Sequence, residues 1–376
     1  MRAALVQHLR ARPTPRVEFG SRHETLIIAG VATVLVIRTQ LWLTHYPQLG
    51  GHGLHIAHLL WGGLFMLLAI GVLLTFIGKP VLRAAAVVGG VGFGFFVDEL
   101  GKFVTEDNDY FYRPAAALIY LIFVALFLLT RALQRREAGR VSAQSNLANA
   151  VELLEEAALR ELDESERRRA LALLQDADPA EPLVAPLRAL FSDLQGSPAA
   201  APGLTARAVD RAREASTRLA AWPRFATCVS CLLGVWAAVS LAGVVELVTG
   251  AVVDLGGGHP GYVSDRLGDL SFVNVASLAS SALSAALVAR GVLQLRHGTR
   301  AAAYRSFEHA LLVAILVTQV FSFVESQFGA VFGLALDLVL LVALRTVQSN
   351  DPAAQAAAVP APRAVARPLR PVSAGP

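Results

Sequence analysis

Residues 56–77 read IAHLLWGGLFMLLAIGVLLTFI, an apolar run whose only ionisable side chain is His58. An α-helix needs about 20 apolar residues to cross the hydrocarbon core of a bilayer. A run of this length therefore predicts a membrane-spanning helix. Further runs of the same kind on both sides of it make the chain a polytopic membrane protein in contact with the lipid bilayer.

The composition of the whole chain agrees with this prediction. Of the 376 residues, 55% are hydrophobic and 16% are charged, whereas soluble domains carry about 25% charged residues. This deficit of charge argues against a soluble enzyme. The net charge of +4 implies no nucleic-acid partner, because the basic residues gather in the segments between alternate apolar runs.

The apolar runs predict an all-α fold with eight transmembrane helices. The third run is weakened by glycines, and the seventh has only a short uncharged stretch. The eight runs are residues 25–43, 56–77, 81–97, 114–130, 225–245, 270–288, 310–324 and 328–344.

The distribution of basic residues predicts the orientation of these helices. Loops rich in Lys and Arg stay in the cytoplasm. With the N-terminus inside, the outer loops contain only Lys102, Arg113 and Arg266. Both termini are therefore expected in the cytoplasm. A six-helix alternative, with the third and seventh runs as re-entrant loops, would export the Arg-rich middle segment and is disfavoured. The Ala- and Arg-rich composition, with two lysines, is typical of a high-GC genome and favours a bacterial inner membrane.

The two halves of the chain predict a tandem repeat of four plus four helices. FVDE at 96–99 corresponds in order to FVES at 323–326, and Gly30-Val31 corresponds to Gly234-Val235. An even number of helices in each repeat gives both the same orientation. The predicted parts are a basic cytoplasmic N-terminus at 1–24, the first repeat at 25–134, a cytoplasmic insert at 135–222, the second repeat at 223–348 and a disordered cytoplasmic tail at 349–376.

The insert at 135–222 is the only sizeable polar part of the chain. Leucine and alanine stripes among Glu and Arg predict two to four amphipathic helices, and proline- and glycine-containing stretches separate them. The insert has two possible roles. It is either a linker between the repeats or a docking surface for a cytoplasmic protein partner.

Polar residues gather at the outer ends of the first three helices. His55 and His58 share a helix face, because three residues turn a helix by about 300 degrees. At 1.5 Å per residue, His58 and Asp98 both lie roughly 26–28 Å above the inner surface, and Arg38 lies roughly 20 Å above it. Charged groups inside a bilayer mark functional sites by default. The sequence therefore predicts an outward-opening polar pocket built from Arg38, His55, His58, Asp98 and Glu99.

Three chemistries suit this pocket. Two imidazoles with a carboxylate can bind a divalent metal such as zinc, with His55, His58 and Asp98 as its ligands. The same groups can transfer protons, because histidine titrates near neutral pH. The structural alternative is a clamp in which Arg38 pairs with Asp98.

Asp337, inside the eighth run, is a second intramembrane acid without an evident basic partner, and is either a proton site or a hydrogen-bonded packing residue.

Three classes of function follow from these features. The favoured one is a transporter or ion- or proton-coupled carrier that uses the pocket. The second is a membrane-embedded metal-dependent hydrolase with Glu99 as the general base. The third is a non-catalytic sensor or scaffold that acts through the insert. The sequence contains no phosphate-binding loop, dinucleotide fingerprint, His-Glu-x-x-His or Gly-x-Ser-x-Gly motif that would name a reaction.

Overall fold

The computed structural model describes residues 18–44, 58–104, 114–138, 142–194, 224–241 and 272–351, with isolated positions outside these ranges. Every regular element among these residues is a helix, so the all-α prediction is confirmed. The chain divides into two compact units. Unit 1 combines Met1–Ala206 with Ser322–Gly329, and unit 2 combines Arg207–Phe321 with Ala330–Pro376.

Six segments are long and apolar enough to cross a membrane, judged by length and composition. Leu74 and Phe332, which lie in two of them, are each 83% exposed, as suits contact with lipid chains. The six segments are Phe19–Leu41, His58–Thr75, Lys79–Lys102, Ala115–Glu137, Phe272–Arg296 and Arg300–Asn350.

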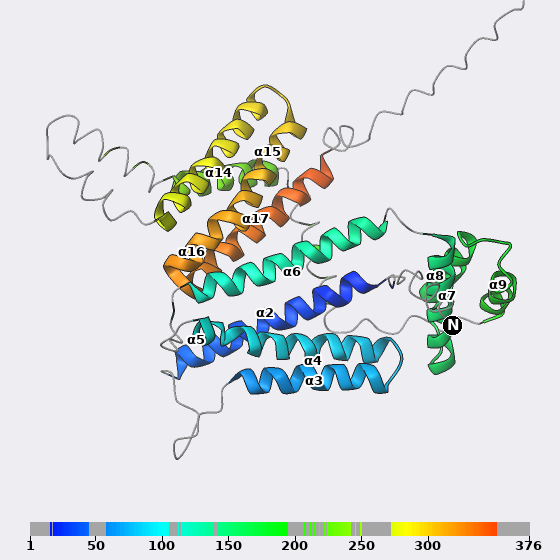
Figure 1. Cartoon of the computed structure of the whole chain (residues 1–376). Helices are drawn as coiled ribbons and strands as arrows, with labels where there is room; N and C mark the ends of the chain where they lie inside the picture. The colour runs from blue at the N-terminus through cyan, green and yellow to red at the C-terminus, as the bar shows by residue number, and fades with distance from the viewer. Residues whose placement is uncertain are drawn as a thin grey trace, which may run out of the picture. The chain divides into compact units, whose positions relative to one another are not determined.

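In unit 1 these segments form four long helices that lie side by side in Figure 1. The short helix α5 follows the third of them. The helices are α2 (Phe19–Leu43), α3 (His58–Thr75), α4 (Lys79–Asp98), α5 (Leu100–Val104) and α6 (Ala115–Ala138).

Helix α4 runs antiparallel to α3. Gly78, with φ +104°, provides the left-handed turn between them. A Cβ atom on Gly92 would lie 2.8 Å from the carbonyl oxygen of Gly62, and one on Gly89 would lie 3.4 Å from the Cβ of Ala69. Small residues thus let the two backbones approach closely.

The opposite face of α4 packs against α2, and these two helices run parallel. A Cβ atom on Gly94 would lie 2.6 Å from the carbonyl oxygen of Gly30, and four residues further along α4, Asp98 meets Arg38 of α2. The glycines that weaken residues 81–97 as an apolar run do not break the helix. They let α4 pack between α2 and α3.

The described part of the insert contains three helices around a core of their own. Ser142 and Asp163 accept hydrogen bonds from backbone N–H groups at the starts of α7 and α8, as N-caps do. The helices are α7 (Ala143–Leu159), α8 (Glu164–Gln175) and α9 (Val184–Asp193). Their buried apolar residues include Leu147, Leu153, Leu174, Leu187 and Phe191.

The described part of unit 2 contains two helices followed by the two legs of a long helical segment, whose connecting residues Ser322–Gly329 belong to unit 1. Tyr304 bonds to Asp351, Glu308 to Arg345 and Gln319 to Asp337, so the two legs of this segment are antiparallel. The elements are α11 (Phe225–Ser240), α14 (Phe272–Arg296), α15 (Arg300–Val313), the π-helical turn η1 (Ala314–Thr318), α16 (Gln319–Ser326), the 3-10 turn η2 (Gln327–Gly329) and α17 (Ala330–Asn350).

The count of spanning segments differs from the eight expected from sequence. Residues 310–324 and 328–344 fall within one 51-residue segment, Arg300–Asn350, which the turn η2 divides. Helix α11 has 16 residues, or about 24 Å at 1.5 Å per residue, against a hydrocarbon core of about 30 Å. The four-plus-four arrangement therefore stays a prediction.

Two glycines that correspond in the proposed repeat, Gly30 and Gly234, differ in local packing. A Cβ atom on Gly30 would lie 2.9 Å from the ring of Phe123, whereas no atom of the described residues lies within 4 Å of the same position on Gly234. The two glycines that correspond in sequence therefore differ in their surroundings.

Several predictions concern residues outside the described ranges. These predictions include the N-terminal part before Arg16, the tail beyond Asp351, most of the acidic outer loop at 105–113 and the second half of the insert.

Candidate functional site

The first part of the candidate site is an ion pair between α2 and α4. The Nε atom of Arg38 donates to Oδ1 of Asp98 at 2.6 Å, and its Nη2 donates to the backbone carbonyl of Asp98 at 2.9 Å. The Asp98 side chain is fully buried and that of Arg38 is 13% exposed. The guanidinium also lies 4.9 Å from the centre of the Phe328 ring, within unit 1. These contacts hold Arg38 in a single geometry against Asp98.

The second part joins Glu99 to the start of α3. Its Oε1 accepts from the backbone N–H of His58 at 3.0 Å and lies 3.2 Å from the Nδ1 of the same residue. A carboxylate at a helix N-terminus is favoured by the exposed N–H groups there. The His58 ring stacks on Phe95 at 6.0 Å between centroids. Glu99 is 1% exposed, and its Oε2 has no hydrogen-bond partner in the described part of the chain.

The two pairs differ in whether their net charge can change. Arginine stays protonated in proteins, so the Arg38–Asp98 pair is fixed in charge. Histidine exchanges a proton near neutral pH, and the His58–Glu99 pair can therefore exist in two charge states with the same contacts. Asp98 is the last residue of α4 and Glu99 follows it directly, so a fixed ion pair and an exchangeable one lie side by side.

The structure brings together four of the residues predicted for the pocket, namely Arg38, His58, Asp98 and Glu99. His55 lies outside the described residues. The sequence matched the depths of these groups and offered the Arg38–Asp98 pair as the structural alternative, but it did not assign a partner to His58. Arg38 takes Asp98, and His58 takes Glu99.

A divalent metal site of His55, His58 and Asp98 fits this arrangement poorly. Oδ1 of Asp98 accepts a hydrogen bond from a guanidinium, which a cation would have to displace. Among the described residues, no three His, Cys, Asp or Glu side chains are grouped so that they could hold a metal ion. His55 lies outside these residues, so the metal site and the hydrolase alternative with Glu99 as the general base stay predictions.

Asp337 lies in unit 2 with a different set of partners. Its Oδ1 accepts from Nε1 of Trp236 at 2.9 Å, and its Oδ2 accepts from Nε2 of Gln319 at 2.8 Å. The residue is 2% exposed. Both partners are neutral, and no basic side chain in the described part of unit 2 pairs with it. The sequence had shown no evident basic partner for Asp337, but it did not indicate Trp236 and Gln319 as its partners.

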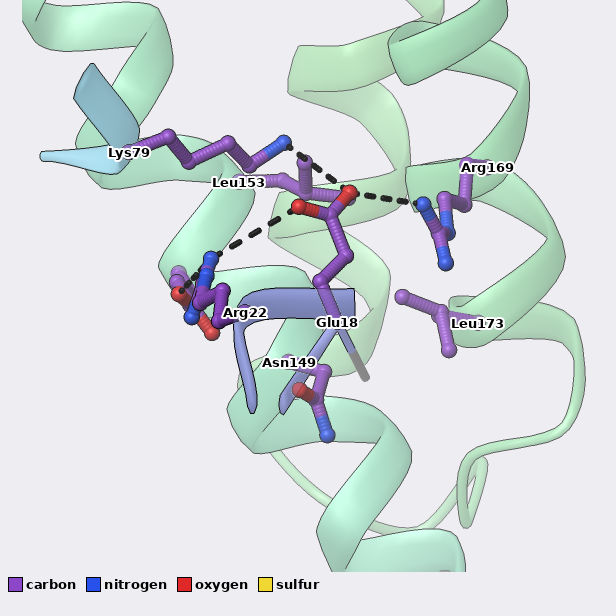
Figure 2. A pocket seen from close by; sticks show the side chains of 8 residues that line it. Glu18, Arg22, Lys79, Asn149, Leu153, Arg169 and Leu173 are labelled. Atoms are coloured by element: carbon purple, nitrogen blue, oxygen red, sulfur yellow. Dashed lines mark hydrogen bonds and ion pairs between the residues drawn. The ribbon is translucent and has the colours of Figure 1, made fainter. Parts of the chain in front are cut away.

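A third polar cluster, which sequence reasoning missed, joins the insert to the N-terminal ends of α2 and α4. Figure 2 shows Glu18 between Arg22, Lys79 and Arg169. Its carboxylate lies 2.9 Å from Arg169, 3.6 Å from Arg22 and 3.8 Å from Lys79. These residues help to line a shallow pocket whose full lining is Glu18, Arg22, Lys79, Asn149, Glu152, Leu153, Arg169 and Leu173. Its basic residues were interpreted only as orientation signals.

Lys79 extends this network deeper into the insert. Its backbone N–H donates to Glu156, and its Nζ donates to Glu166 at 3.1 Å. Arg160 donates to Glu166 at 2.7 Å. Burial raises the pKa of Glu166, but the hydrogen bonds from Arg160 and Lys79 outweigh it and lower the pKa to about 2. Glu166 therefore stays ionised through the physiological range.

No protein-family model, curated protein or solved structure matches this chain. By length and composition, the apolar helices are compatible with an integral membrane protein. The specific function is inferred from the side chains alone.

Proposed function

We propose that the protein is a proton-coupled carrier of the bacterial inner membrane, with its polar site open to the outer side. The observation that carries this proposal is the Glu99 carboxylate. It is 1% exposed, bonded to a histidine, and has one oxygen without a hydrogen-bond partner in the described residues. Intramembrane carboxylates and histidines of this kind are the parts of proton relays in transporters.

The His58–Glu99 pair supplies the coupling in this proposal. A proton that reaches the pair from the outer side changes its net charge from −1 to zero, without loss of the backbone contact from His58. A neighbouring solute would be bound or released in response to that change of charge. Arg38 and Asp98 hold α2 and α4 together while this happens, because their charges do not change.

An eight-helix arrangement with both termini in the cytoplasm accompanies this proposal. The two legs of the folded segment Arg300–Asn350 supply two membrane crossings in place of one. Helix α11, whose apolar stretch is Thr227–Val239, supplies the remaining crossing. Arg22 and Lys79 at one end of unit 1, bonded to the insert, are the residues that the positive-inside rule expects in the cytoplasm.

An uptake assay tests the carrier function directly. Purified protein is reconstituted in liposomes, and a defined mixture of amino acids, sugars, nucleosides, organic acids and inorganic cations is added outside with an inward proton gradient. Mass spectrometry of the vesicle lumen is expected to show accumulation of one solute class that a protonophore abolishes. Glu99→Gln should remove this accumulation, and Glu308→Gln should retain it. A wild-type protein that accumulates nothing above empty liposomes overturns the proposal.

Signalling through the insert is the second candidate, and one observation favours it. The insert has its own apolar core and is bonded through Glu18, Glu156 and Glu166 to the inner ends of α2 and α4. The outer end of α4 bears Asp98 and Glu99. A change at that end can thus be transmitted along one helix to the insert.

One pair of variants separates the two functions. Glu18→Gln/Glu166→Gln should loosen the insert, seen as faster amide hydrogen exchange in α7, α8 and α9. If the protein signals, the Glu18→Gln/Glu166→Gln variant reproduces the phenotype of gene deletion. If it is a carrier, Glu99→Gln reproduces that phenotype and Glu18→Gln/Glu166→Gln does not.

A further inference from the structure

Asp337 occupies an unusual position for a carboxylate within an apolar helix. It is 2% exposed, and the groups that bond to its two oxygens, Trp236 and Gln319, are neutral. An ionised carboxylate in a bilayer is costly unless a cation or another charge offsets it. Two neutral donors stabilise the charge only in part, so a proton bound here would remove a large electrostatic cost.

Gln319 can accept the hydrogen bond that a protonated Asp337 would donate. The Nε2 of Gln319 donates to Asp337, while its Oε1 is buried and has no hydrogen-bond partner in the described residues. Rotation of the amide by about 180° exchanges these two atoms, which are nearly equivalent in shape. Gln319 can therefore donate to the carboxylate and, after rotation, accept from the O–H of the carboxylic acid.

The backbone around Gln319 is arranged to present this amide. Gln319 directly follows the π-helical turn Ala314–Thr318, and such turns occur often at functional sites. Across from it, a Cβ atom on Gly333 would lie 3.2 Å from Nε2 of Gln319. Gly333 stands four residues before Asp337, on the same face of α17. The missing side chain at position 333 leaves room for the amide to rotate.

We propose that Asp337, with Gln319 and Trp236, is a reversible proton-binding site inside the membrane-spanning part of unit 2. In the proton-binding step, an O–H bond forms at a carboxylate oxygen with a proton from the aqueous phase, and the site changes from one negative charge to neutral. No other bond breaks. Gln319 acts as a positioning residue, since it matches its hydrogen bond to either state.

Other charged or titratable groups of unit 2 do not contact Asp337 in the described residues. Glu308 and Arg345 pair with each other, and Arg345 is eight residues, or about 12 Å, from Asp337 along α17. Cys231 on α11 is exposed. The remaining groups on the helices around Asp337 are Cys228, Arg300, Tyr304, Arg305 and His309, whereas Glu325 of α16 belongs to unit 1. A proton bound at this site would therefore change the charge of Asp337 and of no other described group in contact with it.

Trp236 provides the readout, because the indole N–H bonds directly to the carboxylate. The full-length protein is placed in lipid nanodiscs, and tryptophan emission is followed between about pH 4 and about pH 9, the range in which buried carboxyl groups titrate. The spectrum of a Trp236→Phe variant is subtracted to remove the other tryptophans. The expected result is one reversible step in the Trp236 emission, absent in Asp337→Asn and retained in Glu308→Gln.

Two further variants and one salt series make the test decisive. Asp337→Asn imitates the neutral acid, so its emission at every pH should match that of the wild type at low pH. Gly333→Ala should move the step to lower pH, because the added methyl group restricts rotation of the Gln319 amide. A wild-type signal that does not change with pH overturns the proposal. A step that moves with added NaCl but not with choline chloride overturns it in favour of a metal-cation site.

This site would deepen the proposed carrier function by adding a second proton site, but it is tested apart from it. The titration requires no transport. A protein that titrates at Trp236 and accumulates no solute would refute the carrier function and keep the proton site.

Discussion

Asp98 and Asp337 are both buried acids on membrane helices, and the protein treats them in opposite ways. Asp98, fully buried, accepts a hydrogen bond from an arginine at 2.6 Å. Asp337, 2% exposed, accepts from an indole at 2.9 Å and an amide at 2.8 Å. The first is compensated by a full positive charge, and the second by two dipoles. The comparison shows that burial alone does not assign a role to an intramembrane acid.

The difference in partner charge has a direct chemical consequence. Arg38 keeps Asp98 ionised, so this pair stabilises the packing of α2 against α4. A proton can bind to Asp337 without breaking any ion pair. Four substitutions test whether one carboxylate is fixed in charge and the other exchanges a proton.

The largest effect is expected from Arg38→Met. This change leaves Asp98 buried without its cation, and loss of one partner of a buried pair costs about 3–5 kcal/mol. The free energy of unfolding, measured by denaturant titration in detergent micelles, should fall by that amount. The double variant Arg38→Met/Asp98→Leu should recover most of the loss. A single variant as stable as the wild type would contradict the assignment of Asp98 as a fixed ion pair.

Glu166→Gln tests a third carboxylate whose charge is offset by basic side chains, in the network that joins the insert to Lys79. At neutral pH the loss of charged hydrogen bonds to Arg160 and Lys79 should cost about 1.5–3 kcal/mol. The pKa of Glu166 is lowered to about 2 from a usual value of 4.5, so its stabilising effect is complete above 4.5 and is lost as the pH falls to about 2.

The pH dependence of unfolding checks this assignment. The stability difference between wild type and Glu166→Gln should shrink across that acidic window. The exposed neighbour Glu161, changed to Gln, serves as the matched control and should leave the profile of the wild type intact. A constant difference between Glu166→Gln and the wild type at all pH values would argue against the ion pairs as its cause.

Gly94→Ala tests whether close helix packing brings Arg38 to Asp98. A Cβ atom there would lie 2.6 Å from the Gly30 carbonyl oxygen, and overpacking of this kind costs about 1–3 kcal/mol. Gly63→Ala is the control, since nothing lies within 4 Å of its added Cβ. This control should gain up to about 1 kcal/mol from helix propensity. Equal thermal stability of the two variants would show that the packing at Gly94 is not tight.

The smallest effect on stability is expected from Asp337→Asn. Gln319 can rotate to suit the new amide, so at most one neutral hydrogen bond is lost, or about 0.5–1.5 kcal/mol. Asp98→Asn should cost more, about 3–5 kcal/mol, because it leaves Arg38 without its anion. Denaturant titration of the two variants side by side measures the contrast. Equal losses would remove the distinction between the two acids.

Much of the site in unit 1 could be predicted because depth along a helix follows from residue number. Each residue advances a helix by 1.5 Å, so the apolar boundaries indicated that His58 and Asp98 stand at one level. The contacts of His58 with Glu99 and of Arg38 with Asp98 lie at that level. Residue number does not fix the rotation of one helix about its axis relative to another, so the Arg38–Asp98 pair was only one alternative and Glu99 was not assigned to His58.

Other features depend on contacts between distant residues. Trp236 and Asp337 are 101 positions apart, and Arg169 is 151 positions from Glu18. Neither pair has a local sequence signal, because the residues meet only after the intervening helices have packed. In the sequence, Arg22, Lys79 and Arg169 were visible only as part of a bias in the positions of positive charge.

The sequence by itself determined that this protein is helical and suited to a membrane, because hydrophobicity and length decide which segments can leave water. It also placed Asp98 and Asp337 within those segments. The tertiary structure decided which of them meets an arginine and which meets only neutral donors. The physical reason is that the cost of a buried charge depends on the groups within a few ångströms of it, and those groups come from other helices.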